Sequence, residues 1–295
     1  MIRAHLPSLC EGKWPKVLHN IMAALVVGLE LRAAHPDGSL LLKLVSKIPL
    51  RAVNGRIDHL AFDFARKQLF IDELQNNTVG VVDLGNGKLL HRITGLRGPQ
   101  GVAYVVSADM LFVANDGDGT VRLCRGREFA PAGQLALGSD ADIVRVDAET
   151  GLVFVGCGSG ALAVIDPAKR TKIKDIALTG HPESFQLCAG ARRIFVNAPD
   201  AQSIIVLDPN DGTQESWSTG TDRGNFTMAL DEENQRVLVL YRNPPKLSAG
   251  DTRTGAVIAE RDTCGDVDDA FVDAKRRRVY VTCGEGFVDV LDGSA

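Results

Sequence analysis

The chain has 295 residues, of which 45% are hydrophobic and 24% are charged. These values are those of an ordinary globular protein, so they exclude a disordered or collagen-like chain. The 33 basic and 37 acidic residues leave a net charge of -4, too small to predict general attraction to nucleic acid or to an anionic membrane. The six cysteines are too few for a disulfide scaffold and form no CxxC pair of the kind that binds zinc.

The N-terminal region, residues 1–40, carries an apolar segment of its own. Between Trp14 and Leu29 the apolar residues recur with the spacing of an α-helix, and the last nine positions are all apolar. This run is too short to span a membrane, which needs about 20 residues. It resembles the apolar part of a secretory signal, although Arg32 stands where a cleavage after Ala34 requires a small residue. The sequence favours a periplasmic or secreted protein, with a helix packed on a cytoplasmic protein as the alternative.

One pattern of about 42 residues recurs six times in the domain that follows, residues 41–295. Its first marker is a short apolar strand, and the intervals between successive copies are 42, 42, 41, 43 and 42 residues. The third residues of these strands are Phe70, Phe112, Phe154, Phe195, Leu238 and Tyr280. A second marker is an aspartate that ends another apolar run, at Asp83, Asp166, Asp208, Asp251 and Asp292, and Arg125 replaces it in the second repeat.

Each repeat is predicted to form four short strands separated by turns rich in Gly, Asn and Asp. In the first repeat the strands are expected at residues 58–62, 69–72, 79–82 and 89–93. Four antiparallel strands in a period of this length are typical of a blade, so the fold class is an all-β propeller of four-stranded antiparallel blades. The sixth repeat ends after its third strand. Residues 41–50, which alternate between apolar and other residues, are therefore expected to supply its fourth strand and cover the open sheet edge.

The repeats also resemble those of a known family. The stretches Leu111–Asn115 followed by Gly119–Val121, and Val279–Cys283 followed by Gly286–Asp292, look like the YVTN-type β-propeller repeat of the WD40/YVTN repeat-like group. The chain as a whole is similar to YncE-like bacterial propeller proteins. This resemblance implies an exported protein, often periplasmic, with seven blades and an undefined function. With six repeats visible, the ring has either six blades or seven blades less about one C-terminal repeat, and the resemblance favours the second.

A polar column is found twelve residues before each strand marker. Its members are Asp58, Gln100, Asp142, Glu183, Phe226 and Asp268, and His59, Asn225 and Asp269 adjoin it. Because the first strands of propeller blades line the central channel, these side chains are expected to meet at one acidic mouth. Carboxylates that converge repel one another unless a cation or water lies between them. The column therefore predicts binding of a cation, a small cationic ligand or a basic protein segment. Aspartates that cap a repeated turn are the alternative explanation.

Three functions are compatible with this column. The favoured one is a non-catalytic binding protein, in which Asp58, Asp142, Glu183 and Asp268 form a possible site for Ca²⁺ or Mg²⁺. The second is an enzyme resembling calcium-dependent propeller lactonases. There, Asp58, Glu183, Asn225 and Asp268 would hold the metal, with His59 or His181 as the base. The third is a structural scaffold. The chain has neither a nucleophile elbow nor a P-loop, which counts against an enzyme.

Two further features bear on partners and location. Basic residues gather in the turns at the opposite strand ends, among them Arg66, Lys67 and the run Lys275–Arg278, but aromatic residues are only 5% of the chain, so nucleic-acid binding is not expected. Cys264 and Cys283 flank the inner hairpin of the last repeat. They are either a disulfide formed in an oxidising compartment or two buried thiols, and the second is favoured.

Overall fold

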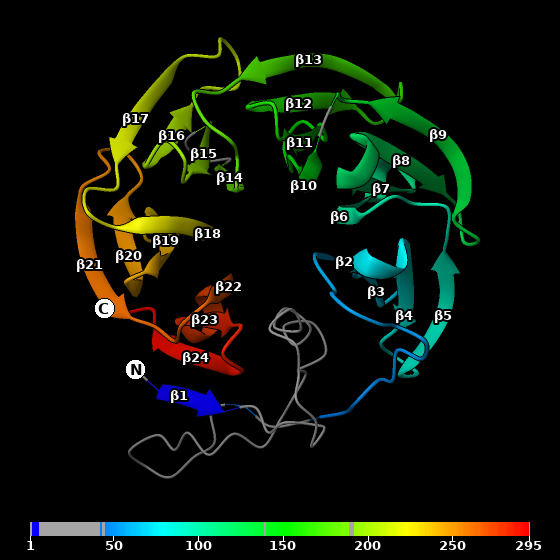
Figure 1. Ribbon diagram of the computed structural model, residues 1–295, viewed down its shortest axis with the longest axis horizontal. Coiled ribbons are helices and arrows are strands. Elements are labelled where there is room, and N and C mark those ends of the chain that lie inside the picture. Colours follow the sequence, from blue (N-terminus) through cyan, green and yellow to red (C-terminus); the bar gives the residue numbers. More distant parts are fainter. Residues whose placement is uncertain (1, 6–41, 43–44, 139, 189–191, 295) are drawn as a thin grey trace. The chain divides into compact units, whose positions relative to one another are not determined.

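The computed structural model describes residues 2–5, 42, 45–138, 140–188 and 192–294 (Figure 1), and the N-terminal apolar segment lies outside these residues. The described strands, β1 to β24, form six antiparallel sheets of four strands each. The helical elements of the described part are short 3-10 turns, and none of its helices has the length and hydropathy of a membrane span. The expected fold class is confirmed: the chain is an all-β propeller with six four-stranded blades.

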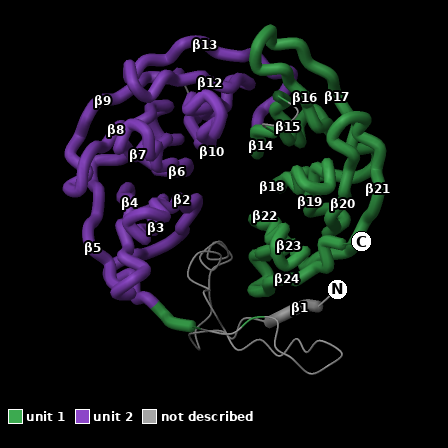
Figure 2. The backbone as a smooth tube through the Cα atoms, turned by 180° about the vertical axis from the view of Figure 1, so that it is seen from behind, with its two compact units in different colours: residues 1–47, 183–295 green, residues 48–182 purple. Residues whose placement is uncertain are grey.

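Three blades belong to the unit of residues 48–182, called unit 2 (Figure 2). Its blades consist of β2 (Leu60–Asp63), β3 (Gln68–Glu73), β4 (Thr78–Asp83) and β5 (Lys88–Ile93); β6 (Pro99–Val105), β7 (Met110–Asn115), β8 (Thr120–Arg125) and β9 (Ala130–Ala136); and β10 (Ala141–Val146), β11 (Val153–Cys157), β12 (Ala161–Asp166) and β13 (Thr171–Ala177). The first strand β6 contacts both β2 and β10, so the first strands of this unit are neighbours.

The other three blades belong to unit 1, residues 1–47 and 183–295. They consist of β14 (Ser184–Cys188), β15 (Arg193–Ala198), β16 (Ser203–Leu207) and β17 (Gln214–Ser218); β18 (Arg223–Asp231), β19 (Arg236–Asn243), β20 (Pro245–Asp251) and β21 (Val257–Asp262); and β22 (Val267–Asp273), β23 (Arg278–Cys283), β24 (Phe287–Asp292) and β1 (Ile2–His5). Here the first strand β18 contacts both β14 and β22.

The last blade is completed by β1, which pairs antiparallel with β24 so that Ile2 faces Val290 and His5 faces Phe287. The expectation that residues 41–50 supply this strand is wrong, because residues 42 and 45–50 form no strand. An edge strand has N–H and C=O groups along one side that no neighbouring strand pairs with. β1 pairs with these groups of β24. All six repeats therefore form complete four-stranded blades.

The strand markers form the centre of the packing. Phe70, Phe112 and Phe195 lie on the second strands of their blades and are fully buried. The second and third strands of each blade are nearly continuous apolar runs because both faces of the sheet are covered, whereas the fourth strands β5, β9, β13, β17 and β21 are mostly exposed. A buried phenylalanine of this kind contributes roughly 1.5–3 kcal/mol by removal from water alone.

The repeated aspartates have a structural role in the turns. Asp83 Oδ1 accepts hydrogen bonds from the backbone N–H groups of Gly85 at 2.7 Å and Asn86 at 3.2 Å. Asp166, Asp208, Asp251 and Asp292 accept equivalent bonds in their own blades. An aspartate side chain that satisfies turn N–H groups stabilises a tight reversal, which explains why this marker recurs with the repeat.

Aspartates also balance the basic turns. Arg66 forms an ion pair with Asp63 at 3.1 Å and another with Asp109 at 2.7 Å, and Arg276 pairs with Asp273 at 2.7 Å. The strand ends that carry these basic residues therefore carry acidic partners as well. Whether the basic turns bind nucleic acid is not tested by these contacts, and the expectation that they do not stays a prediction.

Cys264 and Cys283 form a disulfide with a Cα–Cα distance of 6.0 Å, so the favoured alternative of two buried thiols is wrong. The bond joins the loop that leads into β22 to the end of β23. Among the described cysteines, Cys124, Cys157 and Cys188 are buried free thiols, and burial raises the pKa of the first two to about 11. A thiol of this kind is unreactive at neutral pH.

Candidate ligand-binding site

The polar column lies on the first strand of each blade or directly before it. Gln100, Asp142, Phe226 and Asp268 each occupy a β-bulge, where the pairing of the first strand with the second shifts its register. A bulge bends the strand and redirects its side chain. The column therefore recurs because one backbone irregularity recurs.

The two remaining column members stand one or two residues ahead of their strands. Asp58 precedes β2 and donates its backbone N–H to Asp72 O at 2.9 Å, while Glu183 precedes β14 and donates its own to Asn197 O at the same distance.

Neighbouring first strands of unit 2 pack closely against one another. A Cβ atom on Gly101 of β6 would lie 2.5 Å from Asp142 O of β10. Only glycine permits this approach without a shift of backbone.

In unit 2 the best-defined group is the pair Asp58 and His59. Asp58 Oδ1 lies 3.1 Å from His59 Nδ1, and Asp58 Oδ2 lies 3.0 Å from Arg56 Nη2. Only 8% of the Asp58 side chain is exposed. Both oxygens of this carboxylate are therefore in contact with basic side chains rather than with backbone N–H groups, so the turn-capping alternative does not describe Asp58.

The charge of His59 follows from these contacts. Burial lowers the pKa of His59 and Arg145 opposes protonation too, but the ion pair with Asp58 and the charge of Asp142 outweigh both and raise it to about 10. His59 is consequently an imidazolium ion at neutral pH. Both of its nitrogens then carry protons, so the ring is a donor of two hydrogen bonds and cannot accept a proton as a base.

Behind this pair lies Asp72, a residue that the column did not contain. Its side chain is fully buried and neither carboxyl oxygen has a hydrogen-bond partner. Asp72 N donates to His59 O at 3.0 Å, so the residue is fixed against the same backbone. Burial raises the pKa of Asp72 well above its usual range; the charge of His59 opposes this, and those of Asp58 and Asp142 add to it. The signal in the sequence was a pair of carboxylates, Asp72 and Glu73, that directly follow the apolar residues Leu69–Ile71 within one strand.

In unit 1 the predicted Asn225 belongs to a buried amide network. Asn225 Nδ2 donates to Asn197 Oδ1 at 3.4 Å and to Ser203 O at 3.0 Å. Asn197 Nδ2 in turn donates to Ser184 Oγ at 3.0 Å and to Thr227 O at 3.2 Å. Asn225 Oδ1 is buried and has no hydrogen-bond partner. This network joins β14, β15, β16 and β18. Asn197 occupies the place in its repeat that Asp72 occupies in the first, a correspondence that the sequence reasoning did not use.

The acidic residues of unit 1 lie on neighbouring strands around this network. Glu183 precedes β14, and Asp268 and Asp269 lie on β22, while β18 with Asn225 contacts both strands. Asp269 Oδ1 accepts from Thr227 Oγ1 at 3.3 Å and from Ala270 N at 2.8 Å. Asp269 therefore partly fits the capping alternative, since it satisfies a local backbone N–H.

Phe226 is the apolar member of the column, and an arginine covers it. The Arg242 guanidinium lies 3.3 Å from the ring centroid, and Arg242 Nε donates to Val267 O at 3.1 Å. Asp266 Oδ1 lies 3.4 Å from the same nitrogen. A cation held over an aromatic face and beside a carboxylate is stabilised by both. Phe226 thus has a local partner within its own unit.

The predicted site residues fall into two groups. Unit 2 contains Asp58, His59, Gln100 and Asp142, and also His181, which lies near its end in the loop before β14. Unit 1 contains Glu183, Asn225, Asp268 and Asp269. Within the described ranges, no three His, Cys, Asp or Glu side chains are arranged as a metal site. Each group is therefore considered within its own unit.

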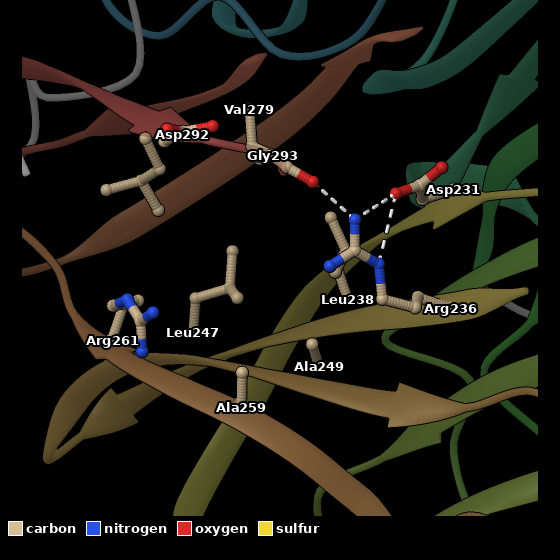
Figure 3. Close-up of a pocket in the computed structure, with 11 residues that line it drawn as sticks. Asp231, Arg236, Leu238, Leu247, Ala249, Ala259, Arg261, Val279, Asp292 and Gly293 are labelled. Atoms are coloured by element: carbon tan, nitrogen blue, oxygen red, sulfur yellow. Dashed lines mark hydrogen bonds and ion pairs between the residues drawn. The ribbon is translucent and has the colours of Figure 1, made fainter. Parts of the chain in front are cut away.

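A small pocket of unit 1 lies between the fifth and sixth blades (Figure 3). It is lined by Arg236, Asp231 and Gly293 at one side and by aliphatic side chains such as Leu238 and Leu247 at the other. Its volume of about 30 Å³ is enough for one or two water molecules. Arg236 bridges its walls, because it pairs with Asp231 at 2.8 Å and also donates to Gly293 O. This pocket is too small for an organic ligand.

Comparison with models of protein families gives no match, and comparison with curated proteins gives none. The similarity to a propeller family therefore rests on the blades themselves, which the structure shows.

Proposed function

We propose that the protein is a non-catalytic binding protein that holds a cationic group with the polar side chains of unit 1, namely Glu183, Asn225, Asp268 and Asp269. A β-propeller fold is compatible with a binding or scaffold role, and it specifies no chemistry. The observation that supports a ligand here is Asn225 Oδ1, a buried acceptor without a donor on a strand that contacts those of Glu183 and Asp268. Unsatisfied buried acceptors are costly, and a ligand rich in N–H donors would satisfy this one.

An organic cation fits this group better than a metal ion. Carboxylates and an amide oxygen would accept hydrogen bonds from an ammonium or guanidinium group, and such charge-assisted bonds are about twice as strong as neutral ones. The predicted Ca²⁺ or Mg²⁺ site also requires Asp58, whose two oxygens already contact Arg56 and His59. A divalent ion at Asp58 would lie beside two positive charges, which disfavours it.

The lactonase-like alternative receives less support than binding. It needs Asp58 as a metal ligand and His59 or His181 as a base. The negative charge of Asp58 is already balanced by its ion pairs with Arg56 and His59. His59 carries its proton at neutral pH because Asp58 and Asp142 raise the pKa of His59. The structure gives no comparable argument for His181.

Calorimetric titration of the full chain tests the proposal. The probes are spermidine, a tetralysine peptide, CaCl₂ and MgCl₂, each at low and at moderate salt. We expect saturable binding of spermidine or tetralysine, weakened at least tenfold in Asp268→Asn and Glu183→Gln and weakened by salt. Glu233→Gln is the matched control, because Glu233 is an exposed acid in the β18–β19 turn of the same unit. Binding that is unchanged in both site variants would contradict the proposal, as would heat from CaCl₂ alone.

We also propose that the protein works in an oxidising compartment such as the periplasm. The disulfide between Cys264 and Cys283 supports this location, because such bonds persist mainly outside the reducing cytosol. Cleavage after Ala34 would however remove β1 from the sixth blade. Export of a chain that keeps β1 satisfies both observations. Sequencing the N-terminus of protein purified from the periplasm tests this, and a mature chain that begins after Ala34 would contradict it.

A further inference from the structure

We infer that His59 of unit 2 is a binding site for an oxyanion, the carboxylate or phosphate group of a small ligand, which accepts a hydrogen bond from Nε2–H. This site differs from the proposed function in its unit, its residues and the charge of its ligand. It reverses the charge preference that the acidic column predicts at this position.

The orientation of the ring is the first step. The Nδ1 atom is buried and faces Asp58 Oδ1 at 3.1 Å, yet 28% of the side chain is exposed. Within the described ranges of the chain, Nε2 makes no hydrogen bond with protein atoms and, unlike Nδ1, it is not a buried atom. The edge of the ring that carries Nε2 is therefore open to solvent. A donor that is oriented by an ion pair at its other nitrogen and is open to solvent is suited to a ligand oxygen.

The second step is the balance of charge around the ring. The groups that act on His59 are the carboxylates of Asp58, Asp72 and Asp142 and the guanidinium of Arg145, and Arg56 contacts Asp58 from its other side. Asp72 is fully buried without a hydrogen-bond donor, so its charged form is strongly disfavoured. With Asp72 uncharged, the negative charges are those of the carboxylates of Asp58 and Asp142. The positive charges are those of the His59 imidazolium and the guanidinium groups of Arg56 and Arg145. This group is net positive, which attracts an anion and repels a cation.

Asp58 and Asp72 hold His59 in the position and the charge state that an anion site needs. Asp58 forms an ion pair with Nδ1 and raises the pKa of the ring, so that Nε2 carries a proton at neutral pH. A histidine whose second nitrogen is held by a carboxylate has a defined orientation, as in other sites where imidazole acts as a fixed donor. Asp72 is bonded through its backbone to Asp58 and His59 and so fixes the segment that carries the pair. Asp58 and Asp72 are therefore positioning residues, and His59 is the contact residue.

Nuclear magnetic resonance of full-length protein labelled at histidine tests this inference. The His59 signals are assigned by their loss in His59→Gln, and inorganic phosphate and acetate are titrated separately at neutral pH against NaCl of equal ionic strength. We expect a saturable change of the His59 Nε2 resonance with phosphate, acetate or both, and the response to each probe distinguishes the two classes. The midpoint temperature of thermal unfolding should rise when the same probe is added to wild type or to His91→Gln. It should not rise in His59→Gln.

The outcomes separate this inference from the proposed function. Glu183→Gln and Asp268→Asn should keep the anion response, since they belong to the other unit. Absence of a saturable change with both probes would overturn the inference, and so would a His59 ring that is neutral at pH 7. Both results are read on the wild-type protein, and if His59→Gln fails to fold, the His59 signals are assigned by elimination from variants of the other five histidines.

Discussion

The ion pair of Asp58 and His59 makes the stability of the protein fall in alkaline solution. The pKa of His59 is 6.5 in the unfolded chain and about 10 in the folded protein. A group whose folded pKa is raised contributes stability that is complete below its unfolded pKa and is lost as the pH rises through the folded value. The contribution of His59 should therefore be complete below about pH 6.5 and disappear by about pH 10.

The magnitude follows from the same contact. Each pH unit between the two pKa values is worth about 1.4 kcal/mol, so the upper limit is about 5 kcal/mol. Asp58 is also held by Arg56, and 28% of the His59 side chain is exposed. Both facts reduce the contribution of the pair to the free energy of unfolding, and we expect this contribution to be about 2–3 kcal/mol.

Urea unfolding of wild type and His59→Gln at several pH values measures this contribution. The difference in the free energy of unfolding should be about 2–3 kcal/mol near pH 6 and should vanish near pH 10. His91→Gln is the control, because His91 is an exposed histidine on β5, and its curve should run parallel to that of wild type. A difference that stays constant over this range would refute the assigned charge of His59.

Four other predictions follow from the described contacts. Asp72→Asn should be more stable than wild type at pH 8 but not at pH 4, because a buried acid with a raised pKa loses stability as the pH rises; equal effects at both values would contradict this. Arg236→Met should cost about 3 kcal/mol in urea unfolding, since it removes the cationic partner of the buried Asp231 and leaves it only the neutral donors of Asn234. A cost below about 1 kcal/mol would show that the pair is dispensable. Replacing Cys264 and Cys283 by serine should cost about 3 kcal/mol, as expected for a closed loop of this length, and reduction of the denatured wild type should release two further thiols. Deletion of residues 2–5 should expose the edge of β24, so hydrogen exchange of its amides should become faster while the exchange of β3 in unit 2 is unchanged.

The site shows where sequence reasoning works and where it stops. The column was found because each member stands at the same place in its repeat, and the structure places four of its residues in equivalent bulges. The common mouth was inferred from propeller geometry and stays a prediction. Asp72 and Asn197 occupy the same place in two blades, two residues after the strand marker, but they were missed because most of the other blades have an apolar residue or glycine there.

The sequence by itself determined the number of repeats, the four-stranded pattern within a repeat and the turns between its strands. These features depend on contacts between residues that are close in the chain: alternation within a strand and an aspartate that caps the next turn. In the first repeat the predicted strands lie within two residues of β2 to β5. Only the tertiary structure decided that β1 completes the sixth blade, that Cys264 and Cys283 are joined, and that His59 is charged. These outcomes depend on groups that meet only after folding, because an edge accepts whichever strand reaches it and a charge depends on everything packed around it.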